Sequence, residues 1–189
     1  MIKYFVHKSC YIDEDVIIGD GTKIWHFSHV LSGARIGMNC SFGQNVNIGN
    51  NVRIGNGCKV QNNVSIYEGV ELEDYVFCGP SMVFTNDLTP RAKYPKGKAG
   101  YIKTILHTGA TIGANATIVC GNDIGAWSMI AAGSVVVNNV EPYALIAGVP
   151  GRQIGWVCEC GKVLNESLQC RECGKSYELF NNKLRRKDE

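Results

Sequence analysis

Apolar residues recur at every sixth position along most of the chain. Between residues 12 and 84 these positions hold Ile12, Ile18, Ile24, Val30, Ile36, Phe42, Ile48, Ile54, Val60, Ile66, Leu72, Cys78 and Phe84. The residue four places after each is mostly small or β-branched, from Val16 to Met82. A period of six matches neither an amphipathic helix nor an alternating strand. It predicts short strands separated by turns and coiled into a parallel β-helix, with the aliphatic column inside.

Glycine and asparagine mark the turns of this repeat. Glycine often follows the aliphatic position directly, as at Gly19, Gly37, Gly43, Gly49, Gly55 and Gly79. We expect glycine or asparagine at the turns to supply the positive φ angles that tight turns require.

One irregular segment interrupts the repeat. Apolar residues six positions apart resume at Leu106, Ile112, Ile118, Ile124, Ile130 and Val136, 22 residues after Phe84 and therefore in a new register. The intervening residues include Asn86-Asp87 and Lys96-Gly97-Lys98, which suit an exposed excursion. The sequence predicts a protruding loop at about residues 85–105.

Composition narrows the class of protein. The 189 residues carry 19 Lys and Arg against 17 Asp and Glu, a net charge of +2, and 45% are hydrophobic. These values exclude collagen, a disordered acidic tail and a multipass membrane protein, and they argue against a dedicated nucleic-acid binder. No run approaches the roughly 18 apolar residues of a membrane span, and the start shows no cleavage signature. We expect a cytoplasmic protein with reduced thiols.

The nine cysteines form two groups. Cys10, Cys40, Cys58, Cys78 and Cys120 lie within the repeats, and we interpret them as packing residues. The other four follow Trp156 with the spacing C-x-C-x9-C-x2-C: Cys158, Cys160, Cys170 and Cys173. Two paired knuckles, each followed by glycine, predict a closed structural zinc site, although the first lacks one residue of the usual C-x-x-C. Free thiols or a disulfide pair are the alternatives.

This arrangement predicts two parts, a β-helix at residues 1–156 and a zinc-ribbon-like tail at residues 157–189. The tail, at about 30 residues, is too small for a core of its own, so we expect metal to supply its folding energy.

The hexapeptide pattern resembles the hexapeptide-repeat acyltransferase family over about residues 10–155. The resemblance implies an all-β, left-handed parallel β-helix of triangular section, with three hexapeptides per coil, so that residues 18 apart stack. It also implies a homotrimer with active sites between neighbouring subunits. Some members are carbonic anhydrases or nucleotidyltransferase appendages, and a β-helix can be purely structural, so the fold alone defines function weakly.

Four segments narrow the resemblance: Trp25 to His29, Gly43 to Val46, Gln61 to Tyr67, and Phe77 to Asp87. In this order they resemble bacterial N-acetyltransferases that act on the 3-amino group of UDP- or dTDP-linked sugars in surface polysaccharide and lipopolysaccharide biosynthesis. Acetyl-CoA is the implied donor. A sugar O-acetyltransferase of the same fold, or a non-catalytic trimeric scaffold, is the alternative.

Coil arithmetic supplies catalytic candidates. Glu68 and Asn86 are 18 residues apart, so we expect them to stack at one corner, at the root of the loop. The carboxylate would orient the sugar amine and accept its proton, and the amide would hold the amine or a hydroxyl. The alternative is that both are solvated corner residues. Among the histidines we favour His29 as a base and then His26, rather than His7 or His107, because the run from Trp25 to His29 resembles the sugar-acetyltransferase pattern.

Substrate and cofactor contacts are also expected. Arg91 in the loop would bind a diphosphate or a sugar carboxylate through its planar fork. His26, Asn62 and Asn63 are further substrate candidates, although asparagines also commonly fill turns of this repeat.

The small residues Ala114 and Ala132 lie 18 apart, and we expect the pantetheine chain of coenzyme A to approach the backbone beside them. Arg152, in a segment that resembles the C-terminal signature of the family, would meet the coenzyme A phosphates. The chain has no GxxxxGK[ST] loop, which argues against ATP chemistry.

Overall fold

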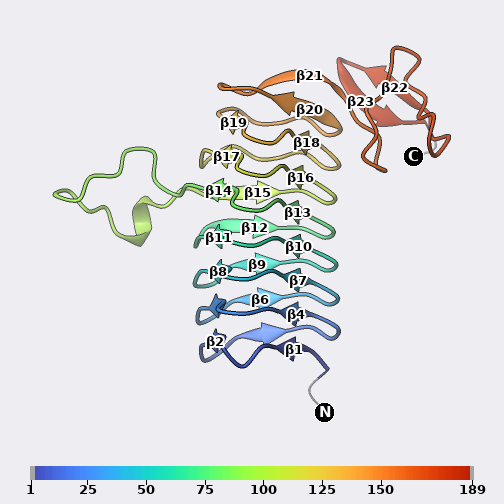
Figure 1. Cartoon of the computed structure of the whole chain (residues 1–189). Helices are drawn as coiled ribbons and strands as arrows, with labels where there is room; N and C mark the ends of the chain where they lie inside the picture. Colours follow the sequence, from blue (N-terminus) through green and yellow to red (C-terminus); the bar gives the residue numbers. More distant parts are fainter. Residues whose placement is uncertain (1–2, 188–189) are drawn as a thin grey trace.

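The computed structural model describes residues 3–187, which form a triangular prism of stacked coils, a protruding loop and a small tail (Figure 1). The first sheet, sheet A, consists of β1 (Phe5–Val6), β4 (Lys23–Ile24), β7 (Ser41–Phe42), β10 (Lys59–Val60), β13 (Phe77–Cys78), β16 (Thr111–Ile112), β18 (Met129–Ile130), β20 (Ala144–Ala147) and β21 (Arg152–Trp156). Sheet B consists of β2 (Tyr11–Ile12), β5 (His29–Val30), β8 (Asn47–Ile48), β11 (Ser65–Ile66), β14 (Val83–Phe84), β17 (Thr117–Ile118) and β19 (Val135–Val136). Sheet C consists of β3 (Ile17–Ile18), β6 (Arg35–Ile36), β9 (Arg53–Ile54), β12 (Val70–Leu72) and β15 (Thr104–Leu106).

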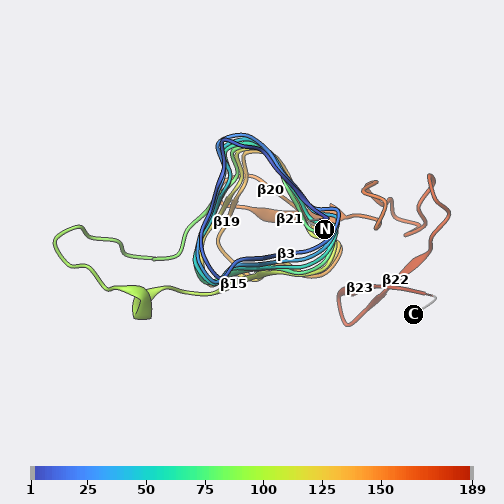
Figure 2. The same ribbon diagram turned by 90° about the horizontal axis from the view of Figure 1, so that it is seen from below.

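The coils stack in parallel register with a spacing of 18 residues. Lys59 lies opposite Ser41 and Phe77, and the same offset recurs in all three sheets. Across the loop the offset grows to 34 residues, as in the pairing of Phe77 with Thr111. Seen from the N-terminal end, the receding chain passes counter-clockwise from sheet C to sheet A to sheet B, so the coils are left-handed (Figure 2). The parallel β-helix predicted from the period is confirmed, as is the all-β, left-handed form that the family resemblance implies.

The aliphatic column fills the interior of the prism. Ile24, Val30, Phe42 and Ile66 are fully buried, and the small positions, such as Cys58, pack beside them. The first coil is the exception: Ile12 is 37% exposed because no preceding coil covers it.

The turns differ from the expectation in one respect. The glycines that follow the aliphatic position do not supply the positive φ angles. They allow close stacking instead: a Cβ on Gly37 would lie 2.6 Å from the backbone of Gly55 in the next coil. The positive φ angles occur two residues later, where Asn39, Asn45 and Asn51 adopt φ values of 55° to 59°.

The loop is slightly shorter than predicted. It leaves β14 after Phe84 and ends at Lys103, because Thr104 and Ile105 already pair with Val70 and Glu71 in β12. A short 3-10 helix, η1 (Lys98–Gly100), forms near its return. Figure 2 shows the loop leaving the corner between sheets B and C.

The tail packs against the last coils. Its hairpin consists of β22 (Tyr177–Phe180) and β23 (Lys183–Arg186). Tyr177, Leu164 and Leu184 are buried in one cluster with Tyr143 of the β-helix, and Trp127 packs against it. The buried cluster of the tail is therefore small and is completed by residues of the β-helix. No helix within residues 3–187 has the length and apolarity to cross a membrane.

We predict that Gly109→Ala destabilises the protein more than Gly133→Ala. Both glycines have φ near +70°, but a Cβ on Gly109 would lie 2.2 Å from the Trp127 ring, whereas a Cβ on Gly133 meets nothing within 4 Å. Both variants incur the left-handed penalty of about 1–2 kcal/mol, and the clash at Gly109 adds roughly 1–3 kcal/mol. Urea unfolding monitored by tryptophan fluorescence measures the difference, and equal midpoints for the two variants would contradict this account of the corner.

Candidate functional site

The prism has three edges (Figure 2), and the candidate residues are distributed among them. The loop edge, between sheets B and C, carries Glu68, Asn86 and the loop at residues 85–103. The second edge, between sheets A and B, carries His26, Gln44, Asn62, Pro80, Ala114 and Ala132 on successive coils. The third edge, between sheets C and A, carries Glu73, His107 and Trp127 and adjoins the tail.

Glu68 is held in place at the loop edge. The Asn51 side-chain amide donates a hydrogen bond to one carboxylate oxygen at 3.0 Å, and Lys98 Nζ lies 3.2 Å from the other. The Asn51 hydrogen bond, with a further contribution from Lys98, lowers the pKa of Glu68. Glu68 is therefore ionised at neutral pH, which suits it to accept N–H hydrogen bonds and makes it a weak proton acceptor.

Asn86 closes the base of the loop. Its carbonyl oxygen accepts the Ile102 N–H at 2.9 Å. Because Ser65 pairs with Val83, Glu68 and Asn86 occupy the same position on successive coils, as the arithmetic predicts. Arg91 lies farther out on the exposed loop, where its guanidinium contacts only the Pro90 carbonyl among the described residues.

Asp87, which the sequence did not single out, stabilises the base of the loop. Its side chain is 17% exposed, pairs with Lys96 and accepts the Thr89 N–H at 2.8 Å. The Lys96 hydrogen bond lowers the pKa of this carboxyl. The sequence does contain a signal for this role, because Asp87 directly follows Asn86 and is the lone acidic residue of a lysine-rich loop.

A hollow of about 350 Å³ lies beside Glu68, under the returning strand of the loop. It is lined by Asn51, Arg53, Glu68, Gly69, Val70, Glu71, Lys98, Tyr101 and Lys103. The sequence pattern did not reveal it, because it forms where the loop folds back onto sheet C.

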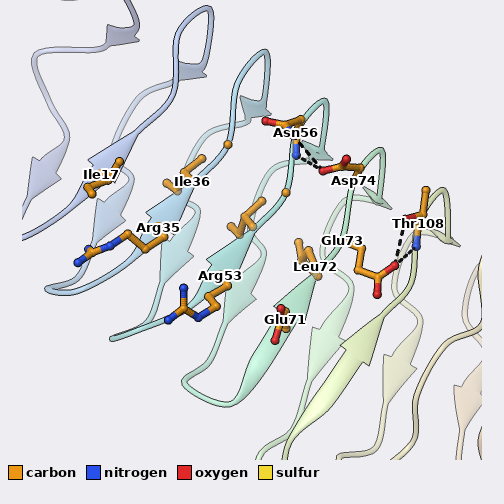
Figure 3. Close-up of a pocket in the computed structure, with 13 residues that line it drawn as sticks. Ile17, Arg35, Ile36, Arg53, Asn56, Glu71, Leu72, Glu73, Asp74 and Thr108 are labelled. Atoms are coloured by element: carbon orange, nitrogen blue, oxygen red, sulfur yellow. Dashed lines mark hydrogen bonds between the residues drawn. The ribbon is translucent and has the colours of Figure 1, made fainter.

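A larger hollow follows the outer face of sheet C toward the third edge (Figure 3). Arg35, Arg53 and Glu71 stand on this face. At the far end, Glu73 accepts the Thr108 N–H at 2.8 Å and contacts His107 Nδ1 at 2.9 Å. Glu73 and His107 thus form a carboxylate–histidine pair, at the opposite end of β12 from Glu68.

The second edge gathers five of the predicted residues. Asn62 accepts the Gln44 N–H at 2.8 Å, and Asn63, with φ of 61°, accepts a hydrogen bond from the side-chain amide of Asn45. These contacts fit the alternative that both asparagines stabilise turns. Ala114 and Ala132 lie on adjacent coils, since the Gly133 N–H donates to the Ala114 carbonyl.

Arg152 stands exposed on β21, and its guanidinium donates only to the Gly151 carbonyl among the described residues. It lies near the end of the second edge, because Gly151 donates its N–H to the Val135 carbonyl.

The favoured histidines lie away from Glu68 and Asn86 within one chain. His29, on β5, is three strands from β14 along sheet B, or about 14 Å at the usual strand spacing. Its Nε2 lies 2.8 Å from Asp13. His26 packs against His7 with ring centroids 3.6 Å apart and the rings tilted by 32°, and its Nδ1 is buried without a hydrogen-bond partner among the described residues.

The four tail cysteines converge. Their sulfur atoms all lie within 4.8 Å of one another, with Cys158–Cys173 at 3.4 Å and Cys160–Cys170 at 3.5 Å. Zn–S bonds of about 2.3 Å in a tetrahedron separate sulfur atoms by about 3.8 Å, so the set fits zinc. Gly161 and Gly174 have positive φ angles, as tight knuckles require. The Tyr177 hydroxyl lies 3.1 Å from Cys158 Sγ and accepts the Glu159 N–H.

Comparison with known proteins identifies the class. The family model described as bacterial transferase hexapeptide (six repeats) matches residues 15–50. The chain is 44% identical, over 92% of its length and 90% of the relative's, to dTDP-3-amino-3,6-dideoxy-alpha-D-galactopyranose 3-N-acetyltransferase of Aneurinibacillus thermoaerophilus. It therefore belongs to the bacterial hexapeptide-repeat transferases.

Two further relatives are more distant. The chain is 38% identical over 49% of its length to 2,3,4,5-tetrahydropyridine-2,6-dicarboxylate N-acetyltransferase of Clostridium perfringens, of which it spans only 36%. Its fold is similar to that of a mutant of AntD, an N-acyltransferase from Bacillus cereus in complex with dTDP and coenzyme A. The TM-score is 0.53 and the identity 19%, with 81% of this chain and 82% of that chain covered.

We predict that Asn51→Ala raises the pKa of Glu68, because it removes the largest interaction that lowers it. The stabilisation from the ionised carboxylate is present at neutral pH and is lost as the pH falls through the pKa of the folded state, so the variant loses it at a higher pH. NMR titration of carboxyl-labelled protein measures the shift. Asn50→Ala is the control, since Asn50 contacts the Ser32 carbonyl instead. An identical Glu68 titration in Asn51→Ala would contradict the assignment.

Proposed function

We propose that the chain is an acetyl-CoA-dependent N-acetyltransferase that acts on the 3-amino group of a dTDP- or UDP-linked sugar in surface polysaccharide biosynthesis. The observation that carries the proposal is the 44% identity to a dTDP-3-amino-sugar 3-N-acetyltransferase over 92% of the chain. The positions of Glu68 and Asn86 at the root of the loop are compatible with it.

In this reaction the sugar amine attacks the thioester carbonyl. A C–N bond forms, the C–S bond breaks, and coenzyme A leaves as a thiolate that takes up the proton lost by the nitrogen. We assign Glu68 and Asn86 to hold the amine, with Glu68 as a hydrogen-bond acceptor because its pKa is lowered. His29, which already contacts Asp13, is the candidate base if the amine arrives protonated.

We assign the remaining substrate and coenzyme A contacts by the edge of the prism on which each residue lies. Arg91 on the loop would bind the substrate anion, and His26, Asn62 and Asn63 would contact substrate from the second edge. Ala114 and Ala132 on the same edge would flank the pantetheine chain. Arg152 would meet the coenzyme A phosphates near the end of that edge.

Assembly as a homotrimer explains why these residues occupy different edges of one chain. If active sites form between subunits, the loop edge of one subunit meets a different edge of its neighbour. The proposed location is the cytoplasm, where acetyl-CoA and nucleotide sugars are made. The tail at residues 157–189 is proposed as a separate zinc-binding part that follows the β-helix at residues 1–156.

We predict that the chain transfers acetyl groups to dTDP- or UDP-linked 3-amino sugars. Thiol release from acetyl-CoA is followed with a panel of these sugars, and the matching 3-hydroxy sugars serve as the control. Asn86→Ala is expected to lower kcat/KM at least tenfold, since one hydrogen bond to the reacting group is lost. Absence of thiol release with every 3-amino sugar would refute the function, and unchanged kinetics would remove Asn86 from the site.

We predict one zinc ion per chain, held by Cys158, Cys160, Cys170 and Cys173. A closed set of four thiolates leaves no open position, so the ion would be structural. Metal analysis of purified protein is expected to find zinc in wild type and to find it lost in Cys170→Ser, with lowered thermal stability because binding and folding of the tail are linked. Cys120→Ser, which changes a buried cysteine of the β-helix, is the control and should retain the metal. Wild-type protein without zinc would overturn this assignment.

A further inference from the structure

The hollow beside Glu68 is lined by more cations than acids. Arg53, Lys98 and Lys103 line it together with the two acids Glu68 and Glu71. Lys98 is paired with Glu68. Arg53 and Lys103 have no side-chain hydrogen bond or ion pair to any other residue between 3 and 187. The hollow therefore has three cations against two acids, and the side chains of Arg53 and Lys103 are unpaired beside the residue proposed to hold the sugar amine.

Arg53 lies between a cation and an acid on the outer face of sheet C, because its register partners are Arg35 on β6 and Glu71 on β12. It lies directly opposite Arg35 on the neighbouring strand β6, and both side chains stand on the outer face of sheet C (Figure 3). Like charges opposite each other destabilise a sheet and opposite charges stabilise it, so Arg35 and Glu71 act on Arg53 in opposite directions. Arg35 is anchored by backbone carbonyls, among them those of Gly33 and Ala34, whereas the guanidinium of Arg53 is free. A bound anion would pair with this free guanidinium through its planar fork.

The other walls of the hollow suit the rest of a nucleotide. Tyr101, at the return of the loop, is 40% exposed and presents a planar ring. Asn51 lines the hollow with a polar amide, and the same side chain donates a hydrogen bond to Glu68. A volume of about 350 Å³ lies within the usual range of small-molecule sites.

We propose that this hollow is the nucleotide-diphosphate subsite of the enzyme. Arg53 binds the diphosphate as a fork, Lys103 supplies a second positive charge, and Tyr101 packs against the base. The sugar then extends toward Glu68 and Asn86. This inference rests on the proposed function and adds to it the residues that select a nucleotide-linked sugar over a free sugar.

Coenzyme A also contains a diphosphate, so the source of the anion must be assigned. The hollow adjoins Glu68 on the loop edge, whereas the small residues Ala114 and Ala132 lie on the second edge. We therefore assign the hollow to the nucleotide sugar and not to coenzyme A.

The test is Arg53→Gln, which removes the charge and keeps a polar side chain on the outer face of β9. Calorimetry with dTDP and UDP is expected to show binding at least tenfold weaker than in wild type for the nucleotide that wild type prefers, since a charge-assisted contact is lost. In steady-state assays the KM for the nucleotide sugar rises by a similar factor, and the KM for acetyl-CoA stays unchanged. Lys59→Gln, which removes an exposed cation from the outer face of sheet A, should alter neither.

The outcomes separate the two proposals. Unchanged dTDP and UDP binding in Arg53→Gln, or no binding of either nucleotide by wild type, would overturn the subsite. A rise in the KM for acetyl-CoA alone would assign the hollow to coenzyme A and overturn it as well. Weakened nucleotide binding in an enzyme that acetylates no amino sugar would support the subsite while refuting the function. Lys103→Gln, predicted to weaken dTDP binding by a smaller factor, supplies a second variant if Arg53→Gln fails to fold.

Discussion

The close stacking of coils constrains every other part of this molecule. Most strands of the β-helix contain only two residues, so no single ladder is extensive, and order depends on many coils repeating in one register. At the corners the backbones approach so closely that a Cβ on Gly55 would lie 2.7 Å from the backbone of Asp74. A residue's position in the 18-residue coil therefore fixes its lateral position. An insertion that does not complete a coil has no place inside the prism, and the chain at residues 85–103 is displaced outward as a loop.

The same constraint makes each edge a column of residues drawn from distant parts of the sequence. It places Asn86 over Glu68 at the point where the loop departs. The loop therefore begins beside a carboxylate whose pKa is lowered. At the third edge it places the Trp127 ring over Gly109. The buried cluster of the tail packs against this ring.

Features that follow the period could be predicted from the sequence, and features that break it could not. The aliphatic column, the common position of Glu68 and Asn86, and the convergence of four cysteines all depend on spacing. The hollow at Arg53 depends on how an aperiodic loop returns, so no count along the chain brings Tyr101 to it. The packing of Tyr177 against Tyr143 likewise joins two segments of unrelated spacing, with ring centroids 5.3 Å apart.

Charge links the loop to the proposed chemistry. The loop holds Arg91, Lys93, Lys96, Lys98 and Lys103 with Asp87 as its acid, so the rest of the chain has 14 cations against 16 acids. Two of these cations are used locally, since Lys96 pairs with Asp87 and Lys98 with Glu68. Because the Debye length at physiological salt is about 8 Å, the remaining three act mainly on anions that reach the loop. A cationic loop on a slightly acidic body thus concentrates phosphate-bearing molecules at the edge where Glu68 would receive the amine.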